Sequence, residues 1–397
     1  MIWSRRRFIQ RVGSFSSVGA LSVALPFETW AIGEEAGEVH ASGSTPRFAY
    51  VASSDTDGGH IAVFTVTKER WNLVQTIDSR SPNALVLHPH RDVLYVANQV
   101  SEYEGLPCGT VEAFRIDAKS GELSLLKRQR LSLSGTNPSC IAISPDGKSM
   151  AVSLEGGGAY NLLPLDVNGT PEQVSSIIKE TGAGLHPEHQ GSARPRFVLF
   201  DPMYQNLLSA DLGCDRLSVF CVSDGEMVRN QHVNTVSGSG PARLALHPTN
   251  DMLYAASELD GSLSSYAYER STGKIGKHLQ RFAYSDVSVK ALARHASLIV
   301  HPSGKFLYSS LSGSDGVITV WGVQRLTETL SPIQSFKVAT KSLRGLHISQ
   351  DGSQLYTLSD VDGTVSRISI DKNSGELGST RRQVEVIGAT SIALKYT

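Results

Sequence analysis

A unit of two short apolar runs joined by a tight turn recurs along this chain. In residues 241–258, "PARLAL" is followed by the turn residues "HPTND", and "MLYAAS" then leads directly into Glu258. Related copies occupy residues 81–99, 137–155, 194–211, 295–313 and 343–360, and a half-copy occupies 48–53. Copies recur at intervals of about 50 residues, a period typical of architectures built by repeating one small unit. The repeat therefore restricts the fold more than any other feature of the sequence.

Each copy continues into further apolar runs. A third run follows every copy, at residues 61–66, 110–116, 159–165, 216–222, 262–268, 317–323 and 364–370. Several copies then have a Ser-Gly-Glu-Leu turn, as at 120–123 and 374–377, before a fourth run. No long window has the 3.6-residue period of a helix outside the N-terminal segment. Four short strands per unit and seven third runs predict a seven-bladed β-propeller of four-stranded antiparallel blades, an all-β fold.

The two ends of the repeat region indicate how the ring closes. Residues 47–53, "RFAYVAS", begin on a second strand with no first strand before them. Residues 389–397, "ATSIALKYT", resemble a first strand with nothing after it. We therefore expect the C-terminal strand to complete blade one, which removes the open sheet edges. One propeller domain then covers residues 46–397.

The first 31 residues have the layout of a signal peptide. Ser4, Arg5, Arg6 and Phe8 match a twin-arginine export motif, and a mildly apolar run follows that is too short to span a membrane. We expect cleavage after Ala31, a flexible leader over 32–45, and a periplasmic or secreted mature protein with no membrane span. The alternative is a chance cluster of arginines on an N-terminal anchor.

Composition excludes several classes of function. The chain has 37 Lys and Arg against 38 Asp and Glu, without the basic excess expected of a nucleic-acid-binding protein. Its four cysteines are too few for a disulfide framework and show no CxxC spacing. No phosphate-binding loop, dinucleotide-binding turn or G-x-S-x-G elbow occurs. We expect a monomer without cofactor or metal.

Strand order predicts where a binding site lies. The start of a first strand and the end of a second strand share one end of the channel, which is where sites usually form in such folds. The pairs expected there are Arg243 with Glu258, Arg196 with Asp211, Arg344 with Asp360, Cys140 with Glu155, and Asn83 with Asn98. Three arginines at equivalent positions favour an anion-binding pocket, because Arg binds carboxylate and phosphate in a bidentate manner. The alternative is a ring of solvated charges and ion pairs.

Histidines occur in two settings. His88, His247 and His301 begin His-Pro turns at the opposite end of the channel, where we expect them to be turn residues. A long insertion at 179–196 carries His186, Glu188 and His189 and enters blade four from the pocket end. It is long enough to cover the pocket, but its spacing is not a strong metal-ligand pattern.

Several segments resemble one known family. "SPDGK", "LYVANQ", "DLGCDRLSVF", "SELDG" and "EGGGAYNLLPLDVNGTPEQ…TGAGLHPEHQ" are similar to the lactonase family of seven-bladed propellers, which includes 6-phosphogluconolactonases and carboxy-muconate cyclases. The resemblance implies lactone hydrolysis and a glutamate matching Glu258. Arg344 matches the arginine of blade seven. The family's histidines and blade-six arginine are replaced at 194–196, 241–243 and 310–313.

Two functions remain open. In the first, an exported hydrolase opens a lactone of an anionic sugar acid or similar compound, with Glu258 as the base and Arg243 as its catalytic partner. The residues expected to bind substrate or assist proton transfer are Arg196, Arg344, Arg194, His186, His189, Asp211 and His295. In the second, a non-catalytic periplasmic propeller binds an anionic ligand or a protein partner at the same place.

Overall fold

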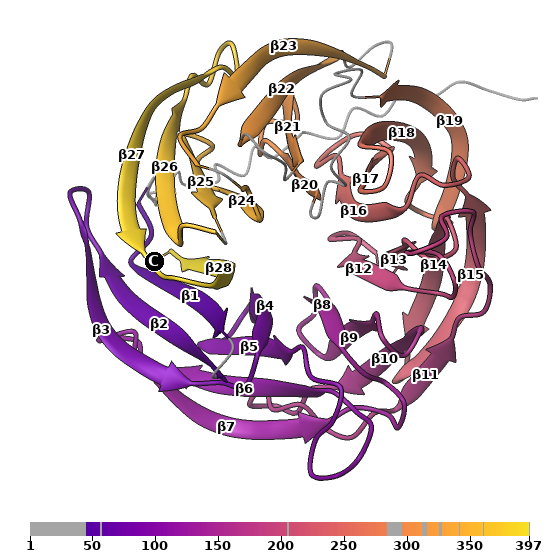
Figure 1. Ribbon diagram of the computed structural model, residues 1–397, viewed down its shortest axis with the longest axis horizontal. Helices are drawn as coiled ribbons and strands as arrows, with labels where there is room; N and C mark the ends of the chain where they lie inside the picture. Colours follow the sequence, from indigo (N-terminus) through magenta and orange to yellow (C-terminus); the bar gives the residue numbers. More distant parts are fainter. Residues whose placement is uncertain are drawn as a thin grey trace, which may run out of the picture. The chain divides into compact units, whose positions relative to one another are not determined.

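The repeated unit forms a blade of four antiparallel strands, and seven blades surround a central axis (Figure 1). The computed structural model describes residues 45–396 except 56–57, 205, 284–295, 312–315, 325–327, 341 and 360. Within these ranges there are twenty-eight strands and no helix. No helix in this part of the chain is long and apolar enough to cross a membrane. The predicted fold class is confirmed, whereas the segments 1–31 and 32–44 lie outside the described residues.

The strands of each blade follow one another outward from the axis. Blade 1 consists of β28 (Ala389–Lys395), β1 (Phe48–Asp55), β2 (Gly58–Val66) and β3 (Trp71–Asp78). Blade 2 consists of β4 (Pro82–Leu87), β5 (Val93–Asn98), β6 (Thr110–Ile116) and β7 (Leu123–Arg130). Blade 3 consists of β8 (Pro138–Ile143), β9 (Ser149–Leu154), β10 (Ala159–Pro164) and β11 (Ser176–Lys179). Blade 4 consists of β12 (Pro195–Phe200), β13 (Asn206–Asp211), β14 (Arg216–Ser223) and β15 (Glu226–Asn234).

The remaining blades have the same organisation. Blade 5 consists of β16 (Pro241–Leu246), β17 (Met252–Ser257), β18 (Ser262–Glu269) and β19 (Lys274–Ala283). Blade 6 consists of β20 (Ala296–Val300), β21 (Phe306–Leu311), β22 (Val317–Gln324) and β23 (Thr329–Lys337). Blade 7 consists of β24 (Gly345–Ile348), β25 (Gln354–Leu358), β26 (Thr364–Ile370) and β27 (Leu377–Glu385).

The two ends of the chain's repeat region pair as expected. Strand β28 lies antiparallel to β1, with Tyr50 opposite Ala393. Figure 1 shows β28 at the inner edge of blade 1, where the other blades have their own first strand. The C-terminal strand therefore closes the ring.

Blades pack through large side chains of the second strands. Tyr50, Tyr95 and Tyr308 are fully buried, and each donates a hydrogen bond from its hydroxyl to a turn carbonyl of the next blade, at Gly121, Gly169 and Gly375 respectively. Aliphatic side chains from adjacent blades fill the space around these rings. These three tyrosines of the second strands therefore join neighbouring blades.

The His-Pro turns also join neighbouring blades. The Nε2 atoms of His88, His247 and His301 lie 2.8–3.0 Å from the turn carbonyl oxygens of Gly147, Gly304 and Gly352. Their Nδ1 atoms accept hydrogen bonds from backbone N–H groups of their own turns. These histidines are turn residues, as the sequence predicted.

A β-bulge lies near the start of several innermost strands. Strands β4, β8, β12 and β16 each begin at a proline, and the register shifts directly after it. A bulge places two residues opposite one and turns the local side chains. It affects the residues at one end of the channel, where the candidate site lies.

Candidate functional site

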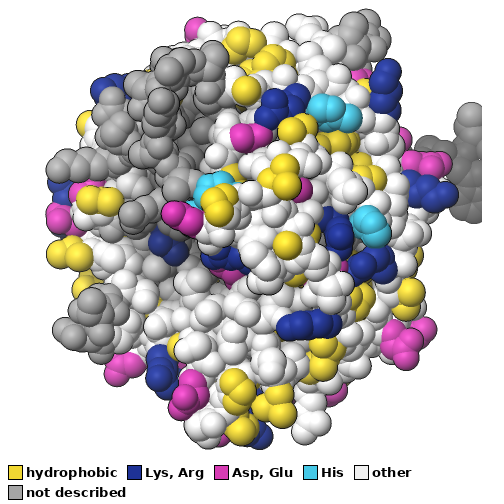
Figure 2. All heavy atoms as spheres, turned by 45° about the vertical axis from the view of Figure 1, so that its right-hand side comes forward, with side chains coloured by type: hydrophobic (Ala, Val, Ile, Leu, Met, Phe, Trp, Pro, Cys, Tyr) yellow, Lys and Arg dark blue, Asp and Glu magenta, His cyan; other side chains and the backbone are white. Residues whose placement is uncertain are grey.

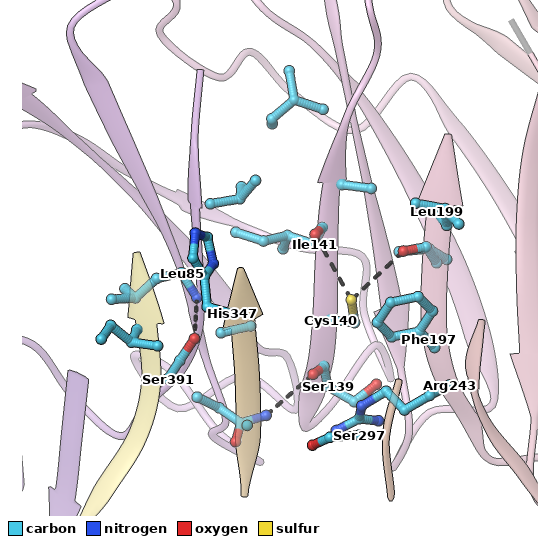
Figure 3. A pocket seen from close by; sticks show the side chains of 18 of the residues that line it. Leu85, Ser139, Cys140, Ile141, Phe197, Leu199, Arg243, Ser297, His347 and Ser391 are labelled. Atoms are coloured by element: carbon cyan, nitrogen blue, oxygen red, sulfur yellow. Dashed lines mark hydrogen bonds between the residues drawn. The ribbon is translucent and has the colours of Figure 1, made fainter. Parts of the chain in front are cut away.

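The innermost strands enclose a cavity of about 690 Å³. All seven blades contribute residues to its wall. Figure 3 shows Ser139, Arg243 and Ser297 at one end of the cavity, with Cys140, Phe197 and His347 farther along it. In the space-filling view, basic and acidic side chains lie together in a hollow on the face shown (Figure 2). The volume suits a small molecule, since ligand pockets span roughly 300–1,000 Å³.

The position of each arginine along its innermost strand determines which arginines are equivalent. Counted back from the turn after each strand, Arg196 and Arg344 occupy the same position, whereas Arg243 lies one residue closer to the turn. On the neighbouring second strands, Asp211 lies opposite Pro195 in blade 4, and Ala256 lies opposite Arg243 in blade 5. The expectation that three arginines share one position was therefore wrong by one residue for Arg243. Blades 4 and 5 have the bulge at the same place, but Ala242 separates Pro241 from Arg243, whereas Arg196 follows Pro195 directly.

Arg196 lies between two glutamates from neighbouring blades. Its Nη1 is 2.5 Å from Oε2 of Glu155, and its Nη2 is 3.2 Å and 3.3 Å from the two carboxylate oxygens of Glu258. Arg194 donates to the other oxygen of Glu155. The side chains of Glu155 and Glu258 are only 9% and 5% exposed. The expected pair of Arg196 with Asp211 is replaced by this bridge across three blades.

Electrostatics within this cluster favour the charged forms. Burial alone would raise the pKa of Glu155, but Arg196 and Arg194 outweigh burial and lower that pKa. Burial opposes the charge on Arg196 too, yet Glu258 and Glu155 raise its pKa. Glu155 is therefore ionised at neutral pH and holds Arg196 in place.

Arg243 differs from Arg196 in its surroundings. Its guanidinium carbon is 5.5 Å from the centre of the Phe197 ring, and Nη1 donates to the carbonyl of Ala242 at 2.8 Å. Burial lowers the pKa of Arg243, although the charge of Glu258 raises it in part. Arg243 lines the cavity, so the other guanidinium donors are available to its contents.

Arg344 joins the wall of the cavity to blades 1 and 2. Its Nη2 donates to Oδ1 of Asn83 at 2.7 Å, and its Nε donates to the carbonyl of Thr390 at 3.1 Å. Its expected partner, Asp360, lies outside the described residues. Arg344, Asn83 and Thr390 all line the cavity.

The insertion in blade 4 reaches the cluster through its backbone. The carbonyl of His189 accepts a hydrogen bond from Nη1 of Arg194 at 3.4 Å. The rings of His186 and His189 lie 4.8 Å apart. Gln190 anchors the segment, because its amide donates to Asp215 at 2.8 Å. Neither imidazole is among the groups that line the cavity.

The two remaining predicted residues have different positions. Asp211 is 1% exposed, and its Oδ1 accepts hydrogen bonds from the backbone N–H groups of Arg194, Gly213 and Cys214. Burial raises the pKa of Asp211 to about 6, although these backbone donors lower it in part. His295 lies outside the described residues. No group of three or more His, Cys, Asp or Glu side chains in the described ranges could hold a metal ion.

Two residues of this region were missing from the predicted set of site residues. Glu155 was expected at the channel end, but its contact with Arg196 depends on how blades 3 and 4 pack. His347 lines the cavity from β24. Aligning the repeats could have found it, since "LHIS" in blade 7 corresponds to "LVLH" in blade 2 with His347 at the place of Val86.

Comparisons with known proteins show the family to which this fold belongs. The lactonase family of seven-bladed β-propellers matches residues 39–394. A 6-phosphogluconolactonase of Formosa agariphila is 24% identical over 344 residues, covering 85% of this chain and 95% of that protein. A 6-phosphogluconolactonase of Bacillus subtilis is 22% identical and covers 75% and 82%. The solved periplasmic gluconolactonase of Pseudomonas aeruginosa is 22% identical, covers 89% and 99%, and superposes with a TM-score of 0.78. The chain belongs to the lactonase family of seven-bladed β-propellers.

Proposed function

We propose that this protein hydrolyses a lactone of an anionic sugar acid or a related compound in the central cavity. The observation that carries the proposal is a buried carboxylate, Glu258, close to two arginines at the cavity wall. Ester hydrolysis needs a base for the attacking water and donors for the oxyanion. Glu258 supplies the first, and Arg243 supplies the second.

The reaction follows from these roles. Glu258 accepts a proton from a water molecule whose oxygen attacks the lactone carbonyl carbon. The negative charge on the carbonyl oxygen is stabilised by Arg243, whose positive charge lies in a buried setting where such interactions are strong. The bond from the carbonyl carbon to the ring oxygen then breaks, and Glu258 returns the proton to the leaving oxygen. Arg196 orients Glu258 throughout.

The charge of the cavity end supports an anionic substrate. Among the described residues that line the cavity, Arg196, Arg243 and Arg344 are basic and no side chain is acidic, while Glu155 and Glu258 pair with Arg196. The net charge at this end of the cavity is therefore positive. Arg344 and Arg243 would bind the substrate's carboxylate or phosphate, because Arg recognises such groups through two parallel hydrogen bonds.

A second candidate is binding of an anionic ligand without catalysis. Arg194 and Arg196 are already engaged by Glu155, which is the arrangement of an ion-pair network. In that case Glu258 would balance Arg196 and would not activate water.

Measurement of lactone hydrolysis by the purified protein tests the proposal. The substrates are δ-gluconolactone, 6-phosphogluconolactone and a neutral lactone, followed by the release of acid. Glu258→Gln should lower kcat about 100-fold or more, as for loss of a general base, with a much smaller effect on thermal stability because Arg196 keeps Glu155 as its partner. The matched control is Glu226→Gln, on the outer strand β15, which should retain full activity. Full activity in Glu258→Gln, or no turnover of any lactone, would favour the binding function.

We also propose export by the twin-arginine route, based on Ser4, Arg5, Arg6 and Phe8. Replacing both Arg5 and Arg6 with Lys should leave the protein in the cytoplasm of the producing cell. Fractionation of periplasm and cytoplasm measures this. Normal export of the double variant would contradict the proposal.

A further inference from the structure

The inner part of the cavity differs chemically from its charged end. In blades 2–7, the first turn residue after the innermost strand donates an equivalent backbone hydrogen bond to the start of the next strand. Positions along the six innermost strands can therefore be compared by counting back from this turn residue. Three residues before this turn residue, every strand carries an aliphatic side chain. These residues are Leu85, Ile141, Val198, Leu244, Leu298 and Leu346.

The next level toward the turn contains one exception. Two residues before the turn residue, the blades carry Val86, Ala142, Leu199, Ala245, Ile299 and His347. One residue before it, all six are again apolar. His347 is therefore the one polar side chain on these three levels of blades 2–7.

His347 is a neutral hydrogen-bonding group that faces the cavity. It lines the cavity, and it makes no hydrogen bond to any described residue. Burial lowers the pKa of His347 to about 4, so that at neutral pH the ring has one N–H donor and one acceptor nitrogen. Figure 3 shows this imidazole among aliphatic side chains, including Leu85.

The distance between the two polar zones sets the length of a ligand. Arg344 directly precedes strand β24, and His347 lies three residues after it. A strand rises about 3.3 Å per residue, so the two positions are separated by about 10 Å. The wall between them is largely aliphatic. A molecule that spans both zones has a charged end, an apolar body and a polar far end.

We propose that the ligand of this cavity is an anionic lactone with a hydrocarbon-rich arm, whose acidic group binds the arginines and whose far polar group hydrogen-bonds to His347. This inference names the substrate class of the proposed lactonase site and rests on that function for the lactone ring alone. A fully hydroxylated sugar acid fits the aliphatic levels less well, because buried hydroxyl groups need partners and the side chains there offer only the His347 imidazole and the Ser391 hydroxyl of blade 1, which already accepts a hydrogen bond from the backbone N–H of Leu85.

Binding of stable acids to the full-length protein tests the inference without turnover. The probes are octanoate, 8-hydroxyoctanoate and gluconate, measured by isothermal titration calorimetry at pH 7. 8-Hydroxyoctanoate has an extended chain of about the required length. We expect it to bind more tightly than octanoate by roughly fivefold to tenfold, the usual gain from one hydrogen bond, and gluconate to bind most weakly.

Variants separate the two ends of the site. His347→Leu should remove the preference for 8-hydroxyoctanoate while leaving octanoate affinity unchanged, and His347→Gln serves the same comparison if the leucine variant does not fold. The matched control is His232→Leu, on the exposed outer strand β15, which should change nothing. Arg344→Gln should weaken both fatty acids.

The outcomes are decisive for this inference and independent of hydrolysis. Gluconate binding as tightly as octanoate would overturn it, since the backbone edges of the strands would then accommodate hydroxyl groups. A hydroxyl preference that survives His347→Leu, or no binding of either fatty acid, would overturn it as well. If the expected pattern appears while no lactone is hydrolysed, the ligand class stands and the proposed lactonase activity fails.

Discussion

The two ends of the innermost strands use the same buried residue types for different purposes. At the turn end, Arg270 donates to Asp201 and to the backbone carbonyls of His247 and Asn250, which ties blades 4 and 5 together. At the other end, Arg196 and Arg243 border a cavity. The pair of Arg270 with Asp201 and the pair of Arg196 with Glu258 are both largely buried. A buried arginine is therefore structural where its donors meet backbone, and it is a candidate for binding where its donors meet a cavity.

The comparison predicts its largest effect at the turn end. Arg270→Met should lower the free energy of unfolding by about 3–5 kcal/mol, because Asp201 would remain buried without its cationic partner. Urea denaturation monitored by tryptophan fluorescence measures the change.

The control for this substitution is an ion pair nearer the surface. Arg281 and Asp260 form a pair at 2.5 Å with side chains 30% and 25% exposed. Arg281→Met should cost at most about 1 kcal/mol, as for surface pairs. Equal losses in the two variants would show that burial does not distinguish the pairs.

Arg243→Met should have the opposite profile to Arg270→Met. Burial already disfavours the charge of Arg243, as its lowered pKa indicates, so its removal should change the free energy of unfolding by less than about 1 kcal/mol. Affinity for a carboxylate ligand should fall about tenfold or more, since a charge-assisted hydrogen bond is lost. Calorimetric titration with octanoate and urea denaturation together measure both quantities.

A large loss of stability in Arg243→Met with unchanged affinity would contradict this division. It would place Arg243 in the same class as Arg270 and leave Arg344 as the remaining candidate for the ligand's anion.

The sequence predicted the fold better than it predicted the site. Blade number and ring closure depend on strand runs that are visible as repeats. The last run, "ATSIALKYT", matched the first strand that blade 1 lacked. Contacts of Glu155 depend on the angle between neighbouring blades, which a repeat pattern does not contain. The offset of Arg243 could have been found by aligning the repeats, since Arg243 is the second residue after Pro241 and Arg196 is the first residue after Pro195.

The sequence predicted the location of the site residues better than it predicted their contacts. Glu258 was expected beside Arg243 of its own blade; its charge acts on Arg243, and it also accepts hydrogen bonds from Arg196 of blade 4. Strand order gave the correct end of the channel for both residues, because it depends only on antiparallel connectivity. The identity of the partner across the blade boundary required side-chain positions.

The smallest predicted effect concerns the histidines of the turn end. Burial lowers the pKa of both His88 and His301, and nearby Arg91 and Lys372 lower it further, whereas the turn carbonyls raise it. In the unfolded chain these histidines take up protons near pH 6.5. Their stabilising contribution is therefore complete above pH 6.5 and is lost as the pH falls through the lower pKa of the folded state.

The physical cause is the Nδ1 atom, which accepts a backbone hydrogen bond only in the neutral ring. Between pH 7.5 and pH 5 we expect a loss of about 1 kcal/mol for each of the two histidines, the value of one hydrogen bond. At the charged end Glu155 stays ionised in this range, but burial raises the pKa of Asp211 to about 6, so its protonation in the folded state should offset part of the loss. Urea denaturation at both pH values should therefore show a smaller loss in His88→Gln and in His301→Gln than in the wild type, with His347→Leu measured in parallel to remove its own contribution. An unchanged pH dependence in both turn variants would show that the acid sensitivity arises elsewhere in the ring.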